Sequence, residues 1–429
     1  MPANFFNIKI KYLTFIKLLF YAFPLFMLME SGYITAYATV LTITALIFFY
    51  SNNIKIKFDI IDYFICLFFL SSLISTLINI KDVGYFIFLK SILDFRFALF
   101  ILMIRNLIKF KFINIKILFI TALISTSFLS LDIIYQHING QDLFGNKPFD
   151  GRFNGIFEHE AIAGSYMQKF FLISLLFILL SNLKNKFTFL TIFINILGIG
   201  VLLSLDRMPF LIYLFALIIL IILLKKYRLI LISNILIILI FFTLLFENYE
   251  LVNNRYKSLN SEFNFSKINF FLKKSNNDNA KINITNENFL RGDYFKIYKS
   301  AYYIWLEDPI IGSGIKSFAI NCNKLLLQKN NLTCSSHPHN IYLEILTNQG
   351  LVGLSIFMFL IILLINNFIK KLYIQSYENE KVINILLFTI LIVELWPLRS
   401  YGSILQTVNG TLFWFLISLV SSKLLVNKN

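Results

Sequence analysis

Long apolar stretches alternate with short polar segments along most of the chain. A helix of about 20 apolar residues is long enough to cross the hydrocarbon core of a bilayer. The pattern therefore predicts an all-α polytopic membrane protein with about twelve transmembrane helices. The expected spans are 13–30, 33–50, 60–79, 85–104, 117–136, 165–182, 187–205, 209–224, 229–246, 341–366, 382–396 and 408–425.

One polar segment, 247–340, is long enough to form a unit of its own between the ninth and tenth expected spans. Its portion 260–288 is rich in Asn, Lys and Ser, a composition typical of a flexible insertion. We therefore expect three parts. They are transmembrane helices 1–9 (residues 1–246), a large outer loop with a partly helical segment (247–340) and transmembrane helices 10–12 (341–429).

Composition supports this interpretation and assigns sides to the loops. The chain has 429 residues, 58% of them hydrophobic, with a formal net charge of +16 and a mean hydropathy of +0.73. Lys and Arg are retained on the cytoplasmic side of short loops, and 19 of them fall in segments on the side of the N-terminus. We expect both termini in the cytoplasm, the first span as a retained anchor and the large loop outside. Topology accounts for about half of the basic residues, so no nucleic-acid partner is expected.

Two histidines open the tenth expected span, within the segment Ser335 to Glu344. Neutral imidazole titrates near ambient pH, which makes His339 the best candidate for a general base. Glu344 lies one helical turn later and is placed to orient an imidazole or a substrate hydroxyl. His337 is the second candidate. A solvated histidine and a metal site are the alternatives, but His-x-His has no evident third ligand, so we expect no metal.

Arginine is scarce in this lysine-rich chain, and five of its eight arginines fall on the expected outer side. A guanidinium fork grips phosphate bidentately, whereas an ammonium is a point charge. Arg207, in a tight turn between spans, and Arg291, in the large loop, are the best candidates for phosphate binding. Arg152 is a weaker one, and Arg255 and Arg399 are expected to be surface charges. Anchoring at lipid headgroups is the alternative for Arg207.

Two further pairs of residues suggest structural roles. Cys322 and Cys334 lie twelve positions apart before the histidines. A disulfide between them and two free thiols are the alternatives. Lys90 and Asp94 share one face of the fourth expected span, where a structural ion pair is favoured over a proton or ion path.

The histidine segment resembles a known motif. His339-Asn340, nine residues and then Gly350-x-x-Gly353 is similar to the His-Asn-x9-Gly-x-x-Gly pattern of the O-antigen ligase family. The resemblance extends over roughly 150–415. It includes the twelve spans, the long outer loop, Asp206-Arg207 after the seventh span and the turn Pro309-x-x-Gly312-x-Gly314.

This resemblance implies a glycosyltransferase of the bacterial inner membrane with a periplasmic active site. The donor would be an undecaprenyl-diphosphate-linked glycan and the acceptor lipid A-core, with membrane lipids around both and no metal or other cofactor. By motif position the base falls on His339, the diphosphate-binding residues on Arg207 and Arg291, and more loosely on Arg152.

Other functions remain open. An O-antigen polymerase, whose acceptor is another lipid-linked glycan, is the closest alternative, and a protein O-oligosaccharyltransferase is less favoured. A polysaccharide transporter or flippase is also less favoured, because neither inverted repeats nor paired broken helices are evident in the sequence.

Overall fold

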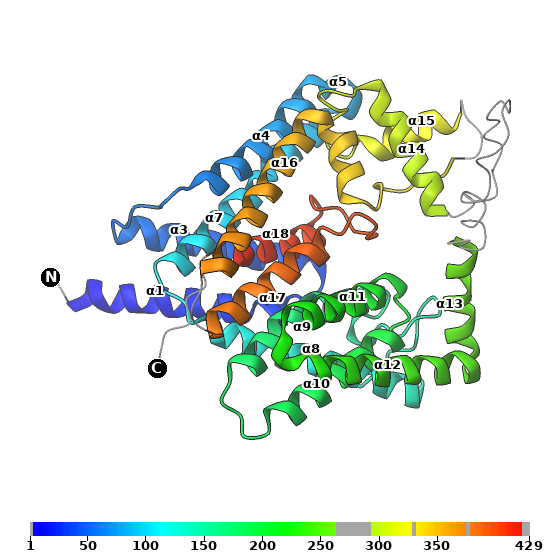
Figure 1. Cartoon of the computed structure of the whole chain (residues 1–429). Coiled ribbons are helices and arrows are strands. Elements are labelled where there is room, and N and C mark those ends of the chain that lie inside the picture. Colours follow the sequence, from blue (N-terminus) through cyan, green and yellow to red (C-terminus); the bar gives the residue numbers. More distant parts are fainter. Residues whose placement is uncertain (1–2, 263–292, 328–331, 375–377, 423–429) are drawn as a thin grey trace.

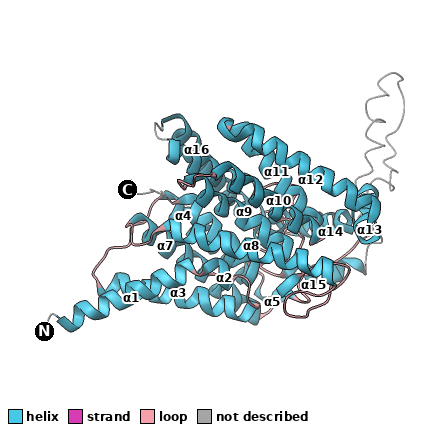
Figure 2. Ribbon diagram, turned by 90° about the horizontal axis from the view of Figure 1, so that it is seen from below, coloured by secondary structure: helices cyan, strands magenta, loops and turns pink. Residues whose placement is uncertain are grey.

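The computed structural model describes residues 3–262, 293–327, 332–374 and 378–422. Every element within these ranges is a helix, as Figure 2 shows, and one isolated bridge joins Phe149 and Arg152. The all-α architecture expected from the sequence is confirmed.

The described part of the chain forms eighteen α-helices and two short 3₁₀ turns. The first half comprises α1 (Ala3–Tyr21), α2 (Phe23–Phe26), α3 (Ser31–Ser51), α4 (Ile60–Ile78), α5 (Ile80–Val83), α6 (Tyr85–Leu93), α7 (Phe95–Lys109), α8 (Ile115–Asn139), η1 (Gly155–Phe157), α9 (Ala163–Leu180) and α10 (Lys186–Leu203). The second half comprises α11 (Arg207–Leu223), η2 (Lys225–Tyr227), α12 (Arg228–Asn248), α13 (Glu250–Glu262), α14 (Asp293–Glu307), α15 (Ser317–Leu326), α16 (Ile341–Ile374), α17 (Glu378–Glu394) and α18 (Thr407–Ser421).

Seven helices of the described residues are long and apolar enough to cross a membrane. They are Ser31–Ser51, Ile60–Ile78, Ile115–Asn139, Ala163–Leu180, Lys186–Leu203, Lys225–Asn248 and Ile341–Lys370. A polytopic membrane protein is therefore confirmed. The other expected spans correspond to shorter or interrupted helices, such as Arg207–Leu223 and Thr407–Ser421. The total of twelve spans and the membrane side of each loop stay predictions.

The helices form two groups with α17 and α18 between them (Figure 1). In one group α4 packs along α16, and α14 packs on α16 and α15. The other contains α8, α9 and α10, with α12 packed on α10 and α11. Helix α17 contacts α9, α11, α16 and α18, so it joins the two groups.

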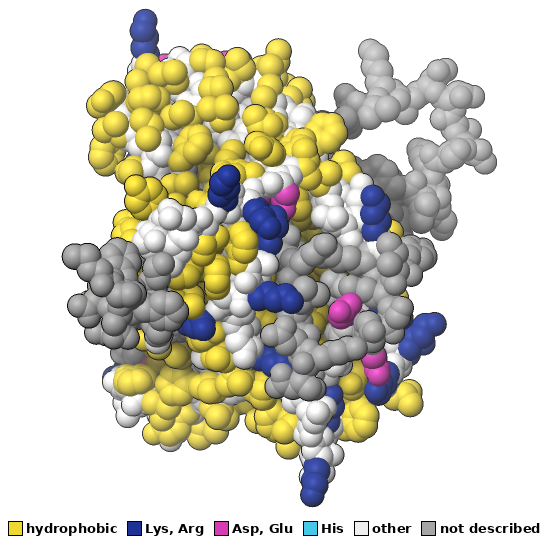
Figure 3. All heavy atoms as spheres, turned by 90° about the vertical axis from the view of Figure 1, so that its left-hand side faces the viewer, with side chains coloured by type: hydrophobic (Ala, Val, Ile, Leu, Met, Phe, Trp, Pro, Cys, Tyr) yellow, Lys and Arg dark blue, Asp and Glu magenta, His cyan; other side chains and the backbone are white. Residues whose placement is uncertain are grey.

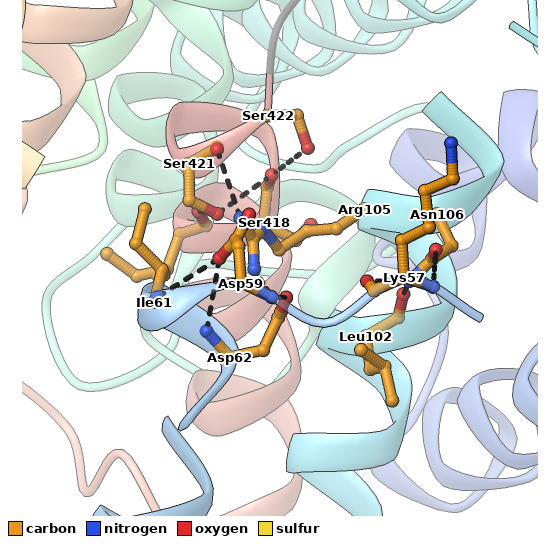
Figure 4. A network of polar contacts seen from close by, with 11 residues as sticks. Lys57, Asp59, Ile61, Asp62, Leu102, Arg105, Asn106, Ser418, Ser421 and Ser422 are labelled. Carbon is orange, nitrogen blue, oxygen red and sulfur yellow. Dashed lines mark hydrogen bonds and ion pairs between the residues drawn. The ribbon is translucent and has the colours of Figure 1, made fainter. Parts of the chain in front are cut away.

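Polar contacts tie together the segments that the charge pattern places on the cytoplasmic side. Arg105, at the end of α7, forms ion pairs with Asp62 and, at 2.7 Å, with Asp59 at the start of α4 (Figure 4). Lys226 pairs with Glu378 at 2.8 Å, which joins two other expected inner loops. Figure 3 views the end where α1 begins, and there Lys and Arg side chains outnumber acidic ones among apolar surface. These contacts are consistent with the prediction that the segments concerned share one side of the membrane.

Helix α16 is broken at Gly350, which has φ 61° and ψ −159°. The turn between α14 and α15 enters the break and replaces the lost helical hydrogen bonds. The bonds run from Ser313 N to Thr347 O (2.9 Å), Gly314 N to Asn348 O (3.0 Å), Leu351 N to Pro309 O (2.9 Å) and Val352 N to Ile310 O (3.1 Å). Figure 1 shows the resulting sharp change of direction within α16. The two glycine motifs of the sequence therefore belong to one structural joint.

Helix α4 supports this joint with a polar stripe on an otherwise apolar span. Ser75 Oγ donates to the carbonyls of Gly312 (3.1 Å) and Asn348 (2.7 Å), and Asn79 Nδ2 donates to Gly312 O at 2.8 Å. Irregular backbone at membrane depth is tolerated where protein groups satisfy it. The polar stripe of α4 meets that requirement.

The fourth expected span, 85–104, is interrupted at Asp94, where α6 ends and α7 begins after it. No direct Lys90–Asp94 ion pair forms among the described residues, so the expected pair is wrong. The Lys90 ammonium lies over the Phe86 ring instead, 4.4 Å from its centroid.

Candidate active site

Asn340 starts α16 and holds the histidine segment in place. Its side-chain oxygen accepts hydrogen bonds from the backbone N–H groups of Tyr342 (3.0 Å) and Leu343 (3.2 Å), as an N-cap residue does. Its amide nitrogen donates to Pro397 O at 2.7 Å. The asparagine of the His-Asn pair therefore has a structural role that fixes the residue before it.

His337 is held on both sides of its ring. Nε2 lies 3.3 Å from the carbonyl oxygen of Tyr401, and Nδ1 lies 3.0 Å from Ser336 Oγ. Because a carbonyl can only accept, Nε2 carries the proton and Nδ1 accepts from the hydroxyl. Burial, with the nearby His339 as a smaller cause, lowers the pKa of His337 to about 4. The imidazole is therefore neutral and fixed in one tautomer at neutral pH.

His339 is placed differently, with its ring between two other rings. The centroid of His337 lies 4.2 Å away, and that of Tyr294 on α14 lies 5.6 Å away in an edge-on arrangement. Its backbone adopts the left-handed conformation, with φ 55°, which is uncommon outside glycine. No hydrogen bond from the described residues reaches either ring nitrogen. Burial lowers the pKa of His339, so this imidazole is also neutral near pH 7.

Glu344 is 5% exposed and turns towards a different partner than expected. Its carboxylate accepts hydrogen bonds from the Ser403 hydroxyl and, at 3.3 Å, from the Ile404 N–H. Among the described residues it makes no hydrogen bond with either imidazole. Glu344 therefore ties the loop between α17 and α18 to the start of α16.

That loop, 395–406, also carries the group that holds both histidines. The Tyr401 N–H donates to His339 O at 2.9 Å, and its carbonyl accepts from His337. The Tyr401 hydroxyl lies 2.7 Å from Glu394 Oε2 and 2.9 Å from Lys169 Nζ.

Arg399, expected to be a surface charge, is only 5% exposed, so that expectation is wrong. It bonds Glu394 at 2.7 Å and Gln168 at 2.8 Å. Sequence reasoning missed these partners because they lie on α9 and α17. A carboxylate and a lysine within apolar spans were the available signal.

A second polar site surrounds Asp206, the residue before α11. Its carboxylate accepts from Arg152 Nη1 and from the Gly164 N–H, both at 3.2 Å. Gly164 fits closely, because a Cβ there would lie 2.8 Å from Asp206 Cβ. Burial raises the pKa of Asp206 to about 6, although Arg152 opposes the shift. Arg152 is itself fixed by a tight turn in which it exchanges two 3.0 Å backbone bonds with Phe149.

Two more arginines share this site. Arg207 is the first residue of α11, and Arg255 lies on α13. The pKa of Arg255 is lowered by burial and then by the positive charges of Arg152 and Arg207. We call these three residues with Asp206 the arginine cluster. Arg255 is half-buried beside two other arginines, and arginine in a lysine-rich loop was the signal for it. Arg291 lies outside the described residues.

Helix α9 connects the arginine cluster with the histidine segment. Gly164, in its first turn, contacts Asp206, and Lys169 bonds Tyr401. Five residues of helix rise about 7.5 Å. The two polar sites therefore adjoin the same end of one helix, although Asp206 and the histidine segment are more than 100 residues apart in sequence.

The structure joins Cys322 and Cys334 in a disulfide, with the two Cα atoms 5.7 Å apart. Cys322 packs in a small core with Ile297, Ile304 and Phe318 of α14 and α15. The bridge thus attaches the segment that leads to His337 to these helices.

His159 lies in a different environment, exposed between two exposed glutamates. Its ring packs edge-on against Phe149 with 4.8 Å between centroids. Among the described residues, no three His, Cys, Asp or Glu side chains are grouped so that they could hold a metal ion.

Comparison with known families supports the resemblance seen in the sequence. The family model described as O-antigen ligase matches residues 190–358, a range that includes the histidine segment, Asp206-Arg207 and both glycine motifs. No curated protein matches the chain. The match supports the family expected from the sequence.

Proposed function

Because residues 190–358 match the O-antigen ligase family, we propose that the protein is an O-antigen ligase rather than an enzyme of another acceptor class. In this proposal it transfers a glycan from undecaprenyl diphosphate to lipid A-core on the periplasmic face of the inner membrane. The family match supports a membrane-embedded enzyme of the ligase or polymerase type. The identity of the donor, the identity of the acceptor and the roles of single residues are what we propose.

His339 is proposed as the general base. Its imidazole is neutral, its ring nitrogens carry no hydrogen bond from the described residues, and the N-cap of α16 fixes the backbone next to it. This is the observation that carries the proposal. A neutral ring nitrogen can take the proton of an attacking sugar hydroxyl. His337 differs, because both of its ring nitrogens are engaged, and we assign it a supporting role.

The arginine cluster is proposed to hold the diphosphate of the donor. Transfer breaks the bond between the anomeric carbon and the diphosphate, whose negative charge grows as the bond breaks. Fixed guanidinium groups stabilise such a charge, and Arg152, Arg207 and Arg255 supply three of them close together, with the carboxylates of Asp150 and Asp206 nearby. One direct displacement by the acceptor hydroxyl inverts the anomeric centre.

Transfer by purified protein tests the base assignment. His339→Ala should lose about 100-fold to 10,000-fold in rate with lipid-linked donor and core acceptor, while donor binding through the arginine cluster persists. His159→Ala is the matched control, since that histidine is exposed and lies on another loop. Equal rates for wild type and His339→Ala would refute the assignment. Chelator should have no effect, and loss of activity restored by a divalent metal would also refute it.

Gel analysis of lipopolysaccharide after gene deletion separates the acceptor classes. A ligase predicts bare core together with accumulated lipid-linked polymer. Core that carries a single repeat unit would identify a polymerase instead. Unchanged lipopolysaccharide would rule out both.

A further inference from the structure

Tyr401 contacts both histidines through its backbone while its side chain points to a different set of groups. Its N–H donates to His339 O and its carbonyl accepts from His337 Nε2. Its hydroxyl, on the other side, is shared by Glu394 and Lys169 at 2.7 and 2.9 Å. One residue therefore joins the imidazoles to charged groups inside the helical bundle.

Those charged groups are almost completely buried. Lys169 on α9 is 4% exposed, Glu394 on α17 is 2% exposed and Arg399 is 5% exposed. We call these three residues the buried ion cluster. It holds two cations and one carboxylate, and intramembrane charges of this kind are costly and retained mainly where they have a function. The cluster contacts the rest of the molecule's polar groups through Tyr401, Gln168 and the end of α17.

Hydrogen bonds connect this cluster to helices α9 and α17 and to Tyr401. Arg399 binds the Glu394 carboxylate, Gln168 and the carbonyl of Val393, so its guanidinium is fixed between α9 and α17. Glu394 in turn holds the Tyr401 hydroxyl. Both cations also lie against the tyrosine ring, with Lys169 Nζ 4.3 Å and the Arg399 guanidinium 4.8 Å from the centroid of Tyr401. Rotation of the Tyr401 side chain would break several contacts at once.

We propose that Tyr401 is a positioning residue, through which the buried ion cluster fixes His337 and His339 in the geometry needed for proton transfer. This inference rests on the proposed function and adds residues to it that lie beyond the matched range 190–358. Tyr401 acts through the histidines, and no contact of its own with substrate is required. The hydroxyl is essential because it is the only polar atom of the side chain that reaches the cluster.

Tyr401→Phe tests this directly, since it removes the hydroxyl and keeps the ring and the backbone. A displacement of about 1 Å at a reacting group can cost about 100-fold in rate. We expect kcat to fall by between about tenfold and 100-fold, while KM for the lipid-linked donor changes less than about twofold, because the arginine cluster is untouched.

Hydrogen exchange supplies a readout that does not depend on activity. Amide exchange over 335–340 should become faster in Tyr401→Phe, because the loop that holds this segment loses its anchor. Ser403→Ala is the second variant, and it releases the same loop at its contact with Glu344. If Tyr401→Phe does not fold, Ser403→Ala should still raise exchange over 335–340.

The pH profile distinguishes positioning from loss of stability. Within the described residues, the titratable groups next to each imidazole are the other imidazole and Tyr294, while the Tyr401 hydroxyl points away from them to Lys169 and Glu394. Looser packing admits water, so the acid limb of kcat/KM should move up towards the ordinary histidine value.

Asp62→Asn is the matched control. It removes the charge that pairs with Arg105 in the first turn of α4 (Figure 4), whereas the contact of α4 with α16 lies near the other end of α4. It should lower stability and leave kcat, the acid limb and exchange over 335–340 unchanged. Unchanged exchange and kcat in both Tyr401→Phe and Ser403→Ala would overturn the inference. Absence of glycan transfer in the wild type would refute the proposed function instead. The hydrogen-exchange measurement would still test whether Tyr401 positions the histidine segment.

Discussion

Gly312→Ala should disrupt the joint between the large loop and α16. Gly312 has φ +78°, and a Cβ built on it would lie 2.5 Å from both Gln349 N and Gly350 N. These neighbours are backbone atoms inside the break of α16, so they cannot turn away as a flexible side chain does. The added methyl group must push the turn out of the break.

The expected loss of stability in Gly312→Ala has two parts. Left-handed backbone costs an alanine roughly 1–2 kcal/mol, and forced overpacking typically costs about 1–3 kcal/mol. Gly312→Ala should therefore destabilise the protein by about 2–5 kcal/mol. Gly140→Ala is the matched control, because Gly140 has φ +75° and a Cβ added there would meet nothing within 4 Å. It should lose only the backbone part, about 1–2 kcal/mol.

Unfolding of purified protein in detergent, followed by helical signal against denaturant, measures both variants. Activity should fall with Gly312→Ala as well, because the first part of α16 carries Asn340 and the histidine segment before it. The reasoning is refuted if Gly312→Ala is no less stable than Gly140→Ala. That result would mean that the turn moves out of the break at no cost.

Three more outcomes are expected. Arg207→Lys should express normally yet lose most transfer, because an ammonium cannot bind a diphosphate bidentately; wild-type rates would reduce Arg207 to a surface anchor. The transfer rate should fall with acidification only below the ordinary histidine pKa of about 6.5, because burial lowers the pKa of His339 and keeps the base neutral there. An acid limb of the pH–rate profile above that value would contradict the base assignment. Replacing Cys322 and Cys334 together by Ser should lower the unfolding temperature in oxidising buffer to that of the reduced wild type. Equal unfolding temperatures for the oxidised wild type, the reduced wild type and the double variant would show that the disulfide has no effect on stability.

The helical architecture could be predicted because its signal is local. A run such as 117–136 is long and apolar enough to indicate a span by itself, and α8 covers it as Ile115–Asn139. The interruption at Asp94 was missed because the residues on both sides, 85–104, are apolar on average. Hydropathy sums over a window, whereas a helix end depends on the backbone of single residues.

The candidate site was predictable only where its residues are close in sequence. His339 and Asn340 are neighbours, and Asn340 is the N-cap that the histidine segment needs. Arg399 was misjudged because its partner Gln168 is 231 positions away. Burial of a charge depends on such distant partners, and one sequence without its fold does not reveal them.

The spacing of the motif acquires a physical meaning when both of its ends are considered. Nine residues separate Asn340 from Gly350, and they form the first part of α16 between an N-cap and a helix break. At one end this short helix carries the histidine segment, and at the other it packs against the turn at Gly312. A change of length would rotate the histidines by about 100° per residue about the helix axis, since a turn takes 3.6 residues. The loop 395–406 could then no longer reach them through Tyr401, so the spacing and the loop constrain each other.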